Sequence, residues 1–400
     1  MNEIFKAPPL STIDKEDQIG AYIQTIIQKA LEHHASDIHM EPRLHDYRIR
    51  YRIDGLLFDV TTIAIDLSKR IVTRLKIMGQ LDIAEKRLPQ DGRIIFNGFH
   101  QMTIRINTCP SMHGEKLVLR LNNSSASLSL NKLGLLQPQY DLFYSKLIHP
   151  HGLILVTGPT GSGKTITLYS ALSALNTSEH NIITIEDPIE IELSGTTQIQ
   201  INDHIGISFS SILRSVLRQD PDIIMVGEIR DQETAALATH AANTGHLVMA
   251  TLHANYAYDV FSRLESLGLA MDRLIFSISL IIAQRLVRKL CSHCKCTTRL
   301  SKHHPLSKFI EAKQFIYEAN GCDYCYQGYS GQTAIFELLP MTDELANLML
   351  KQATKQTILE YLTQHQWISL QIACTQKIMT GETSYQEYLR ILGGIPTHVN

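Results

Sequence analysis

Residues 158–165 read Gly-Pro-Thr-Gly-Ser-Gly-Lys-Thr and match the pattern G-x-x-x-x-G-K-[ST] at every position. An apolar run at residues 153–156 precedes this segment, and a helical pattern at residues 166–175 follows it. A strand, a glycine-rich turn and a helix N-terminus in this order direct backbone N–H groups and a helix dipole at one anion. The segment therefore predicts a phosphate-binding loop. A glycine-rich turn that matches by chance is the alternative, and the flanking strand and helix argue against it.

Each residue type in this loop suits a nucleotide. The loop consists of Gly158, Pro159, Thr160, Gly161, Ser162, Gly163, Lys164 and Thr165. Its glycines let the backbone curl around phosphate oxygens, Lys164 is expected to bridge the β- and γ-phosphates, and Thr165 is expected to bind Mg²⁺. We expect ATP as the nucleotide, because a GTPase would usually carry N-K-x-D. Residues 131–134 (NKLG) break that pattern and lie upstream of the loop.

Four short apolar runs indicate the fold class. They cover residues 153–156, 182–185, 223–226 and 247–250, with helical stretches between them. Runs that are apolar on both faces indicate buried parallel strands in an α/β sheet.

The first 120 residues have a different pattern. Residues 47–53 alternate strictly and place Arg48, Arg50 and Arg52 on one face of a half-buried strand. Helices are predicted over residues 17–35 and 68–79, and further strands over 102–107 and 116–121. This part of the chain is therefore expected to form an α+β domain.

The clearest break in composition, NNSSASLS at residues 122–129, divides the chain. The domains expected along the sequence are a flexible N-terminus (1–16), the α+β domain (17–121), a linker (122–134), the P-loop domain (135–285), a cysteine-containing subdomain (286–340) and a helical region (341–400).

Bulk composition excludes several classes. Lys+Arg 37 against Asp+Glu 39 gives a net charge of −2, which offers no general attraction to nucleic acid. The start of the chain lacks the basic and apolar regions of a signal peptide. The most apolar stretch, residues 274–283, is interrupted by Ser277 and Ser279 and is shorter than the roughly 20 apolar residues that a spanning helix needs. We expect a cytoplasmic protein without a transmembrane segment.

Carboxylates follow two of the apolar runs at the sheet edge that should carry the loop. Glu186 and Asp187 follow one run, and Glu228 follows another after Gly227. Either site could orient the attacking water, and a solvated carboxylate at a strand end is the plainer interpretation of each. Such a strand usually ends in Asp, but Gly227 stands there, so Glu186 or Asp187 is left as the Mg²⁺ partner acting through water.

The cysteines are clustered. Two Cys-x-x-Cys pairs, Cys291 with Cys294 and Cys322 with Cys325, are separated by 27 residues, and a helix within residues 306–319 is expected between them. In a chain without an export signal this clustering favours a metal over disulfides, and four thiolates suit a closed tetrahedral Zn²⁺ site. The gap is longer than the usual zinc spacing of about 15–20 residues, so it would have to enclose a small subdomain. Unliganded reduced thiols, or Cys296 in place of Cys294, are the alternatives.

Together these motifs resemble the secretion ATPases of type II secretion and type IV pilus assembly, and above all those of pilus assembly. The matching segments are S-D-I-H-M-E-P at 36–42, R-I-R-Y-R-I-D-G at 48–55, L-P-Q-D-G-R at 88–93, the phosphate loop, I-T-I-E-D-P-I-E at 183–190, L-R-Q-D-P-D-I-I-M-V-G-E-I-R-D at 217–231, T-G-H-L-V-M-A-T-L-H-A-N at 244–255 and I-I-A-Q-R-L-V-R-K-L-C at 281–291.

The resemblance implies a hexameric motor with a PAS-like N-terminal domain and a RecA-like ATPase domain. Glu228 then matches the Walker B glutamate, Glu186 the aspartate-box glutamate, and His246 and His253 the histidine-box pair. Chemistry alone would favour a structural role for either histidine, because the chain holds 18 of them. Five arginines become candidate phosphate contacts where their spacing alone would indicate a solvated face: Arg48, Arg50, Arg52, Arg87 and Arg93.

The resemblance also implies partners and a place of action. These are an inner-membrane platform protein and pilin or pseudopilin subunits, with the motor peripheral to the inner membrane on its cytoplasmic side. Many relatives carry a further N-terminal domain that docks to the platform, and we expect none here. The family usually has Arg near Gly331, where this chain has Gln332.

Three rival functions remain. A retraction motor of the same superfamily would look similar but lack the paired Cys-x-x-Cys segment. A RecA-like nucleic-acid translocase would be expected to show a basic face or stacking aromatics, yet aromatics are 7% of the chain. A scaffold that binds ATP without hydrolysis would not need Lys164, Thr165, Glu186 and Glu228 all to be present.

Overall fold

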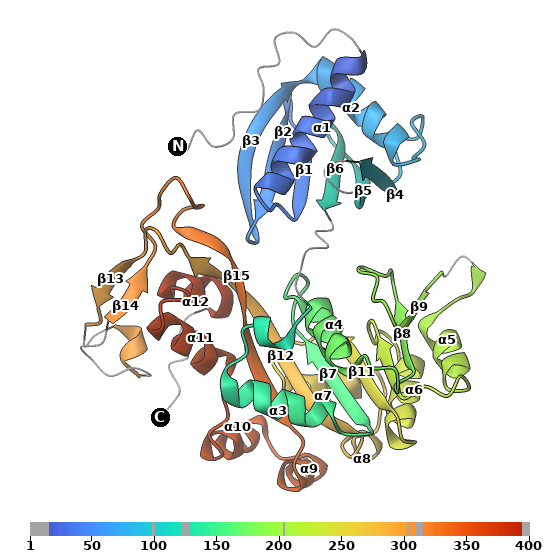
Figure 1. Cartoon of the computed structure of the whole chain (residues 1–400), viewed down its shortest axis with the longest axis vertical. Coiled ribbons are helices and arrows are strands. Elements are labelled where there is room, and N and C mark those ends of the chain that lie inside the picture. Colours follow the sequence, from blue (N-terminus) through green and yellow to red (C-terminus); the bar gives the residue numbers. More distant parts are fainter. Residues whose placement is uncertain are drawn as a thin grey trace. The chain divides into compact units, whose positions relative to one another are not determined.

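The structure is a computed structural model that describes residues 16–97, 101–121, 128–202, 205–301, 304–308 and 315–393. The chain divides into two compact units, Met1–Ala126 and Ser127–Asn400 (Figure 1). Apart from Glu16, the segment expected to be flexible (1–16) lies outside the described residues, and so does the core of the expected linker at 122–127.

The first unit is one antiparallel sheet with two helices. Its strand order is β3-β2-β1-β6-β5-β4. Figure 1 shows both helices on the same face of the sheet. The elements are α1 (Glu16–Glu32), β1 (Asp37–Pro42), β2 (Asp46–Ile53), β3 (Leu56–Ala64), α2 (Ile65–Met78), β4 (Gln90–Asn97), β5 (Gln101–Ser111) and β6 (Gly114–Leu121).

The alternation in β2 explains which face the helices cover. Tyr47, Ile49, Tyr51 and Ile53 are buried, and the hydroxyl of Tyr51 donates to the Ile26 carbonyl of α1 at 2.6 Å. The intervening arginines therefore project from the opposite face of the sheet, as the period of two predicts.

The second unit contains a seven-stranded sheet in the order β15-β12-β7-β11-β10-β8-β9. Neighbouring strands are parallel except for β15, which runs antiparallel to β12. Every residue of β7, β8, β10 and β11 is buried, as their unbroken apolar runs predict. The strands are β7 (Gly152–Thr157), β8 (Ile182–Glu186), β9 (Thr197–Gln200), β10 (Ile223–Val226), β11 (Leu247–Leu252), β12 (Ile278–Leu290) and β15 (Tyr329–Pro340).

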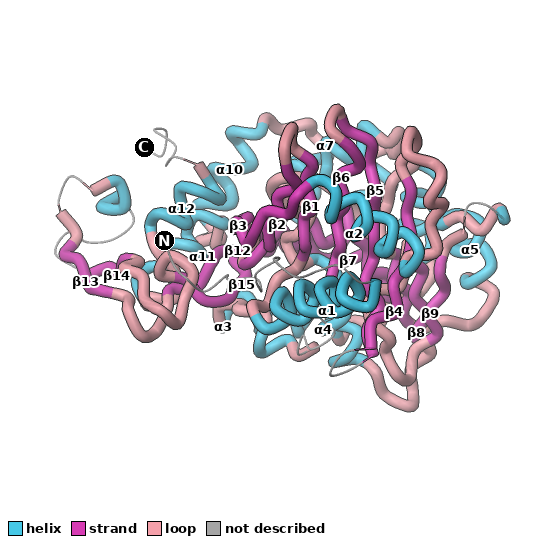
Figure 2. Tube along the Cα trace, turned by 90° about the horizontal axis from the view of Figure 1, so that it is seen from above, coloured by secondary structure: helices cyan, strands magenta, loops and turns pink. Residues whose placement is uncertain are grey.

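Helices cover both faces of this sheet (Figures 1 and 2). One apolar core lies under α3 (Gln137–Leu147) and α4 (Lys164–Leu175). A second core lies under α5 (Phe209–Val216), α6 (Gln232–Asn243) and α7 (Asp259–Ser266). The other helices of this unit are α8 (Met271–Leu274), α9 (Asp343–Leu350), α10 (Lys355–Gln364), α11 (Leu370–Met379) and α12 (Tyr385–Leu392). Of these, α11 and α12 pack against β12 and β15.

The segment expected to form the cysteine subdomain, residues 286–340, contributes to the main sheet at both ends, through β12 and β15. Between them lie a short hairpin, β13 (Cys296–Arg299) with β14 (Phe315–Glu318), and a 3₁₀ turn at Pro305–Lys308. Of the segment in which a helix is expected, 306–319, residues 309–314 lie outside the described residues, residues 306–308 belong to the 3₁₀ turn and residues 315–318 belong to β14. Across the described chain, none of the helices combines the length and apolar character needed to cross a bilayer.

Candidate active site and metal centre

The phosphate loop joins the end of β7 to the N-terminus of α4. Gly158, Gly161 and Gly163 all adopt positive φ, at 145°, 78° and 88°. A Cβ on Gly158 would lie 2.5 Å from the carbonyl oxygen of Gln284, so a larger residue there would displace backbone. The loop therefore has the curled backbone that presents N–H groups to an anion at a helix N-terminus.

Lys164 is held over its own loop. Its Nζ donates to the carbonyl oxygens of Gly158 at 2.8 Å and Pro159 at 3.2 Å. Burial lowers the pKa of Lys164, and the nearby Glu228 carboxylate opposes that shift. A phosphate oxygen is a stronger acceptor for an ammonium group than a carbonyl is, so Lys164 can exchange these contacts for a nucleotide phosphate.

Gln284 on β12 braces the loop from the neighbouring strand. Its Nε2 donates to the Ser162 carbonyl at 2.6 Å, and its Oε1 accepts from the Thr167 hydroxyl at 2.8 Å. Gln284 and Thr167 are both buried. One side chain therefore fixes the loop and the first turn of α4 to each other. Sequence reasoning missed Gln284, although an amide inside the apolar run of β12 was a usable signal, because a buried polar group needs partners.

A charged cluster forms where three parallel strands end. Glu228 follows β10 and forms an ion pair with Arg230. Arg230 also lies 3.5 Å from Asp187 after β8, and His253 after β11 lies 3.7 Å from Glu228. This is the same sheet edge that carries the phosphate loop, because β7, β11, β10 and β8 run parallel. Sequence reasoning did not single out Arg230, which the motif at 217–231 contains.

Glu186 has a different environment from Glu228. Its side chain is 3% exposed and accepts hydrogen bonds from the Tyr169 hydroxyl, the Thr184 hydroxyl at 2.6 Å and Gln198 Nε2 at 3.1 Å. Tyr169 belongs to α4, so this carboxylate joins the end of β8 to the helix that follows the phosphate loop. The ion-pair cluster at the edge instead contains its neighbour Asp187.

The two histidines lie at opposite ends of β11. His253 follows the strand and approaches Glu228, whereas His246 precedes it and contacts the Ala241 carbonyl at 2.9 Å. Since β11 pairs in parallel with β7, His246 lies at the end away from the phosphate loop. The structure brings His253, and not His246, to the candidate active site.

The five candidate arginines belong to the first unit. Arg48 and Arg50 both pair with Glu41, at 3.0 and 2.7 Å, and Arg52 lies 3.6 Å from Asp37. The Arg87 guanidinium pairs with Glu85 at 3.1 Å, and Arg93 on β4 is exposed. Arg48, Arg50 and Arg52 form a row on the sheet face opposite the helices.

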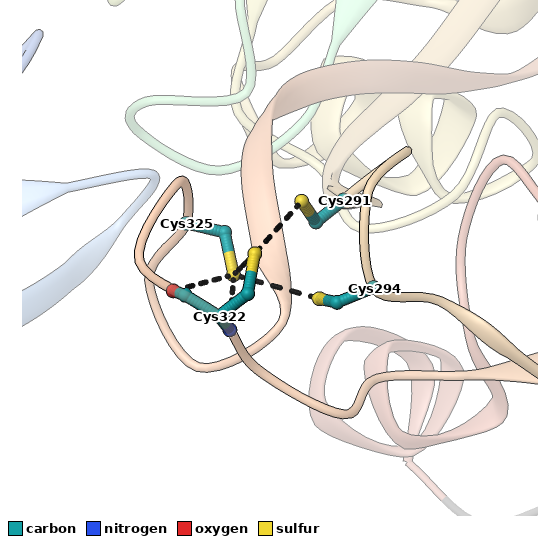
Figure 3. Close-up of side chains that lie close together, drawn as sticks. All are labelled: Cys291, Cys294, Cys322 and Cys325. Carbon is teal, nitrogen blue, oxygen red and sulfur yellow. Dashed lines mark hydrogen bonds between the residues drawn. The ribbon is translucent and has the colours of Figure 1, made fainter.

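The two Cys-x-x-Cys pairs meet in space (Figure 3). The Sγ atoms are 3.8 Å apart for Cys291 and Cys322, 3.7 Å for Cys294 and Cys325, and 3.6 Å for Cys322 and Cys325. A tetrahedral Zn²⁺ with Zn–S bonds of about 2.3 Å requires sulfur separations of about 3.8 Å. The thiols are thus spaced as zinc ligands. Cys296 points elsewhere, with its sulfur against the Glu318 carbonyl.

Comparisons of the sequence with a family model and with known proteins indicate the same family. The sequence model described as "Type II/IV secretion system protein" matches residues 12–390. The type IV pilus assembly ATPase PilB of Acinetobacter baylyi is 43% identical over 385 residues, which cover 94% of this chain and 66% of that protein. The type II secretion system ATPase E of Vibrio cholerae is 43% identical over 388 residues, covering 95% and 76%.

Solved structures share the fold. The pilus retraction motor PilT with bound ADP superposes with a TM-score of 0.63 at 26% identity, covering 94% of this chain and 97% of that one. The Legionella pneumophila ATPase DotB gives a TM-score of 0.70 at 20% identity, covering 97% and 99%, and that likeness concerns the fold alone. The chain spans about two thirds of the length of the pilus assembly relatives it matches.

Proposed function

Because the chain belongs to the type II/IV secretion system protein family, we propose that it is a motor ATPase that hydrolyses MgATP to power type IV pilus assembly or type II secretion. The observation that carries the proposal is the phosphate loop at the N-terminus of α4, with Glu228 at the same edge of the parallel sheet. The family resemblance anticipated from the sequence motifs is confirmed by these relatives.

In this proposal Lys164 holds the β- and γ-phosphates, and the Thr165 hydroxyl binds Mg²⁺. Glu228 orients or deprotonates the attacking water, and His253 lies beside it. Asp187 is the better placed partner for Mg²⁺ through water, since the cluster with Glu228 includes it. Glu186 acts indirectly, because its carboxylate is taken up by Tyr169, Thr184 and Gln198.

The first unit supplies charge in the same proposal. We assign it a PAS-like fold, supported by its antiparallel sheet with α1 and α2 on one face. In a homohexamer, Arg48, Arg50 and Arg52 would approach a nucleotide and neutralise charge in the transition state, with Arg87 and Arg93 beside them. Their row on the face that the helices leave uncovered supports this role.

The four clustered cysteines would hold a structural Zn²⁺. All four tetrahedral positions are then taken by protein ligands, so the ion would have no open position for catalysis. It would instead fix the segment that leaves the sheet at β12 and returns at β15. The same paired motif favours an assembly motor over a retraction motor, since retraction motors lack it.

The proposal includes partners and a location, which the family resemblance suggests. The motor would act with an inner-membrane platform protein and with pilin or pseudopilin subunits, on the cytoplasmic side of the inner membrane. The names of the relatives, a type IV pilus assembly ATPase and a type II secretion system ATPase, support the two kinds of machine that the chain would serve.

Hydrolysis by the purified full chain tests the function directly. Lys164→Ala should weaken ATP binding and hydrolysis together, because it removes the cation that holds the phosphates. Glu228→Gln should bind ATP as the unmodified chain does, but should hydrolyse it about 10²–10⁴-fold more slowly. Binding is measured with a fluorescent nucleotide and hydrolysis by phosphate release.

Two further variants define the outcome. Lys146→Ala, on α3, is a control that should leave both readouts unchanged. Normal turnover in Glu228→Gln together with loss of turnover in Glu186→Gln would transfer the water-orienting role to Glu186. Absence of hydrolysis in the unmodified chain, with ATP still bound, would instead indicate a scaffold.

A further inference from the structure

Glu337 on β15 is a carboxylate in the interior of the second unit, and the proposed chemistry does not use it. It is 0% exposed. Burying a carboxylate is costly unless hydrogen bonds compensate it. Two backbone amides do so: Ala257 N–H donates to Oε1 at 2.8 Å, and Leu370 N–H donates to Oε2 at 3.2 Å. Each carboxylate oxygen therefore accepts one amide.

The two amides come from parts of the chain that are far apart in sequence. Ala257 lies in the loop between β11 and α7, four residues after His253. Leu370 is the first residue of α11, in the C-terminal helical region. The carboxylate of Glu337 thus joins the loop that carries His253 to the start of α11.

The same loop is held at two other points, both on strands next to the phosphate loop. Thr157, at the end of β7, accepts from the Ala254 amide at 2.7 Å through its hydroxyl. Arg285, on β12, donates to the Asn255 carbonyl at 2.8 Å. The segment from His253 to Ala257 therefore has a fixed path past the candidate active site, and Glu337 holds its far end.

We propose that Glu337 is a positioning residue: it holds the His253–Ala257 loop so that His253 faces Glu228, and it couples that loop to α11. A shift at Ala257 would move His253, which lies 3.7 Å from Glu228. A displacement of α11 would reach the same loop through Leu370 and the carboxylate. This inference rests on the proposed ATPase function, because it concerns the geometry of that site.

The charge on Glu337 decides whether both bonds can form. Burial raises the pKa of Glu337 to about 7, against the lowering effect of the two backbone amides. Of the charged groups around it, Asp259 on α7 raises this pKa and Arg285 lowers it, while the Tyr258 hydroxyl is a further titratable neighbour.

A proton on either oxygen makes that oxygen a donor, and it would then face an N–H group. The neutral carboxyl therefore keeps one of the two bonds, and both are present only as the pH rises through about 7. A glutamine has the same limitation at every pH, because its NH₂ group replaces one acceptor.

The test compares the full chain with Glu337→Gln over a pH range centred on about 7. We expect kcat for ATP hydrolysis in the unmodified chain to fall on the acid side of this range. In Glu337→Gln, kcat should be roughly tenfold lower at high pH, the effect of one lost hydrogen bond to a charged acceptor. The acid limb attributed to Glu337 should be absent from its profile. KM for ATP should stay within about twofold, since the phosphate loop is untouched.

Glu387→Gln is the matched control. Glu387 is also 0% exposed, but it lies on α12 and pairs with Arg288 and Arg390. Its loss should lower stability while the acid limb of the hydrolysis profile remains.

Amide hydrogen exchange provides a readout that does not depend on hydrolysis. In Glu337→Gln, the amide of Ala257 or of Leu370 should exchange about tenfold faster than in Glu387→Gln at high pH. If the unmodified chain hydrolyses no ATP, the proposed function fails. The exchange rates would still show whether Glu337 holds the amides of Ala257 and Leu370. Equal exchange and equal pH profiles in the two variants would overturn the positioning role.

A second pair of variants keeps the test valid if Glu337→Gln does not fold. Leu370→Pro removes the amide donor, and proline is tolerated at the first position of a helix. The preceding Ser369, at φ −69° and ψ 166°, is compatible with a following proline. Leu370→Ala loses the same side chain but keeps the N–H. The proline variant should therefore hydrolyse ATP more slowly than the alanine variant, and equal rates would contradict the proposal.

Discussion

The two units place their candidate functional side chains on different parts of a sheet. In the first unit, Arg48 and Arg50 project from an open sheet face, and both pair with Glu41. In the second unit, both faces of the sheet are covered by helices, and the polar groups gather at the edge where parallel strands end. The first unit therefore presents positive charge over a sheet face. The second unit presents backbone N–H groups and polar side chains at one edge of its sheet.

This difference indicates which step each unit serves, nucleotide binding or hydrolysis. A row of arginines paired with carboxylates offers positive charge to an anion but no N–H cradle and no base for water. The edge site has a loop of curled glycines, a lysine and a carboxylate within one small region. We therefore expect the second unit to bind the nucleotide by itself and the first unit to affect the rate of hydrolysis.

The largest effect should follow from removal of residues 1–121. If arginines of the first unit neutralise the transition state, hydrolysis should fall by at least about 10²-fold, given that such an arginine contributes about 10³–10⁵ in rate. ATP should still bind, because the phosphate loop is retained. Circular dichroism must show that the remaining chain is folded, and phosphate release measures the rate. Full activity in the truncated chain would remove the first unit from the chemistry.

A smaller effect, on stability rather than rate, should follow from loss of the metal. Chelation, or Cys322→Ser, should lower the melting midpoint by about 5 °C or more, because a structural metal site contributes folding free energy. Cys296→Ser, outside the cluster, should leave the midpoint unchanged. Elemental analysis should find one zinc per chain. Absence of zinc, with all seven cysteines titrating freely, would refute the site.

The smallest effect should be an acid-dependent loss of stability in the first unit. Burial alone would raise the pKa of Glu41, but hydrogen bonds from Arg50 and Lys116 outweigh it and leave the pKa at about 2. Since this pKa is below the ordinary value of 4.5, the stabilisation is present above about 4.5 and is lost as the pH falls toward 2.

Arg50→Gln should reduce this dependence on pH. Acid titration of the first unit, monitored by far-ultraviolet circular dichroism, measures this dependence on pH. Arg43→Gln removes an ion pair to Asp46 on the same sheet but none to Glu41, and serves as the control. An identical acid transition in Arg50→Gln and the unmodified chain would mean that the pairing with Glu41 does not stabilise the unit.

Local patterns were enough to predict the elements on which the site depends. The unbroken apolar runs predicted β7, β8, β10 and β11, and the strict alternation predicted β2, because each pattern has one natural strand environment. The pattern over residues 278–290 was missed as a strand. Its length and apolar character also suit a buried helix, and only pairing with β7 and β15, distant in sequence, decides between them.

The site was predictable where function depends on sequence order and less so where it depends on packing. The curled, glycine-rich loop at the N-terminus of α4 could be predicted from eight consecutive residues. The contrasting environments of Glu186 and Glu228 could not, because Tyr169 and Gln198 surround one carboxylate only after the chain has folded. The opposite positions of His246 and His253 likewise depend on the direction of β11 in the sheet.

Strand β12 constrains any chimera in which the segment between β12 and β15 is exchanged between relatives. Gln284 contacts the phosphate loop, and Arg285 contacts the loop after β11. Pairing with β15 is regular as far as Arg288, and the strand ends at Leu290, next to Cys291. Since side chains alternate along a regular strand, a splice that adds or drops one residue between Gln284 and Arg288 turns the following side chains of that stretch to the other face of the sheet. In a working chimera, the number of residues in that stretch can therefore change only by an even number, whatever residues occupy it.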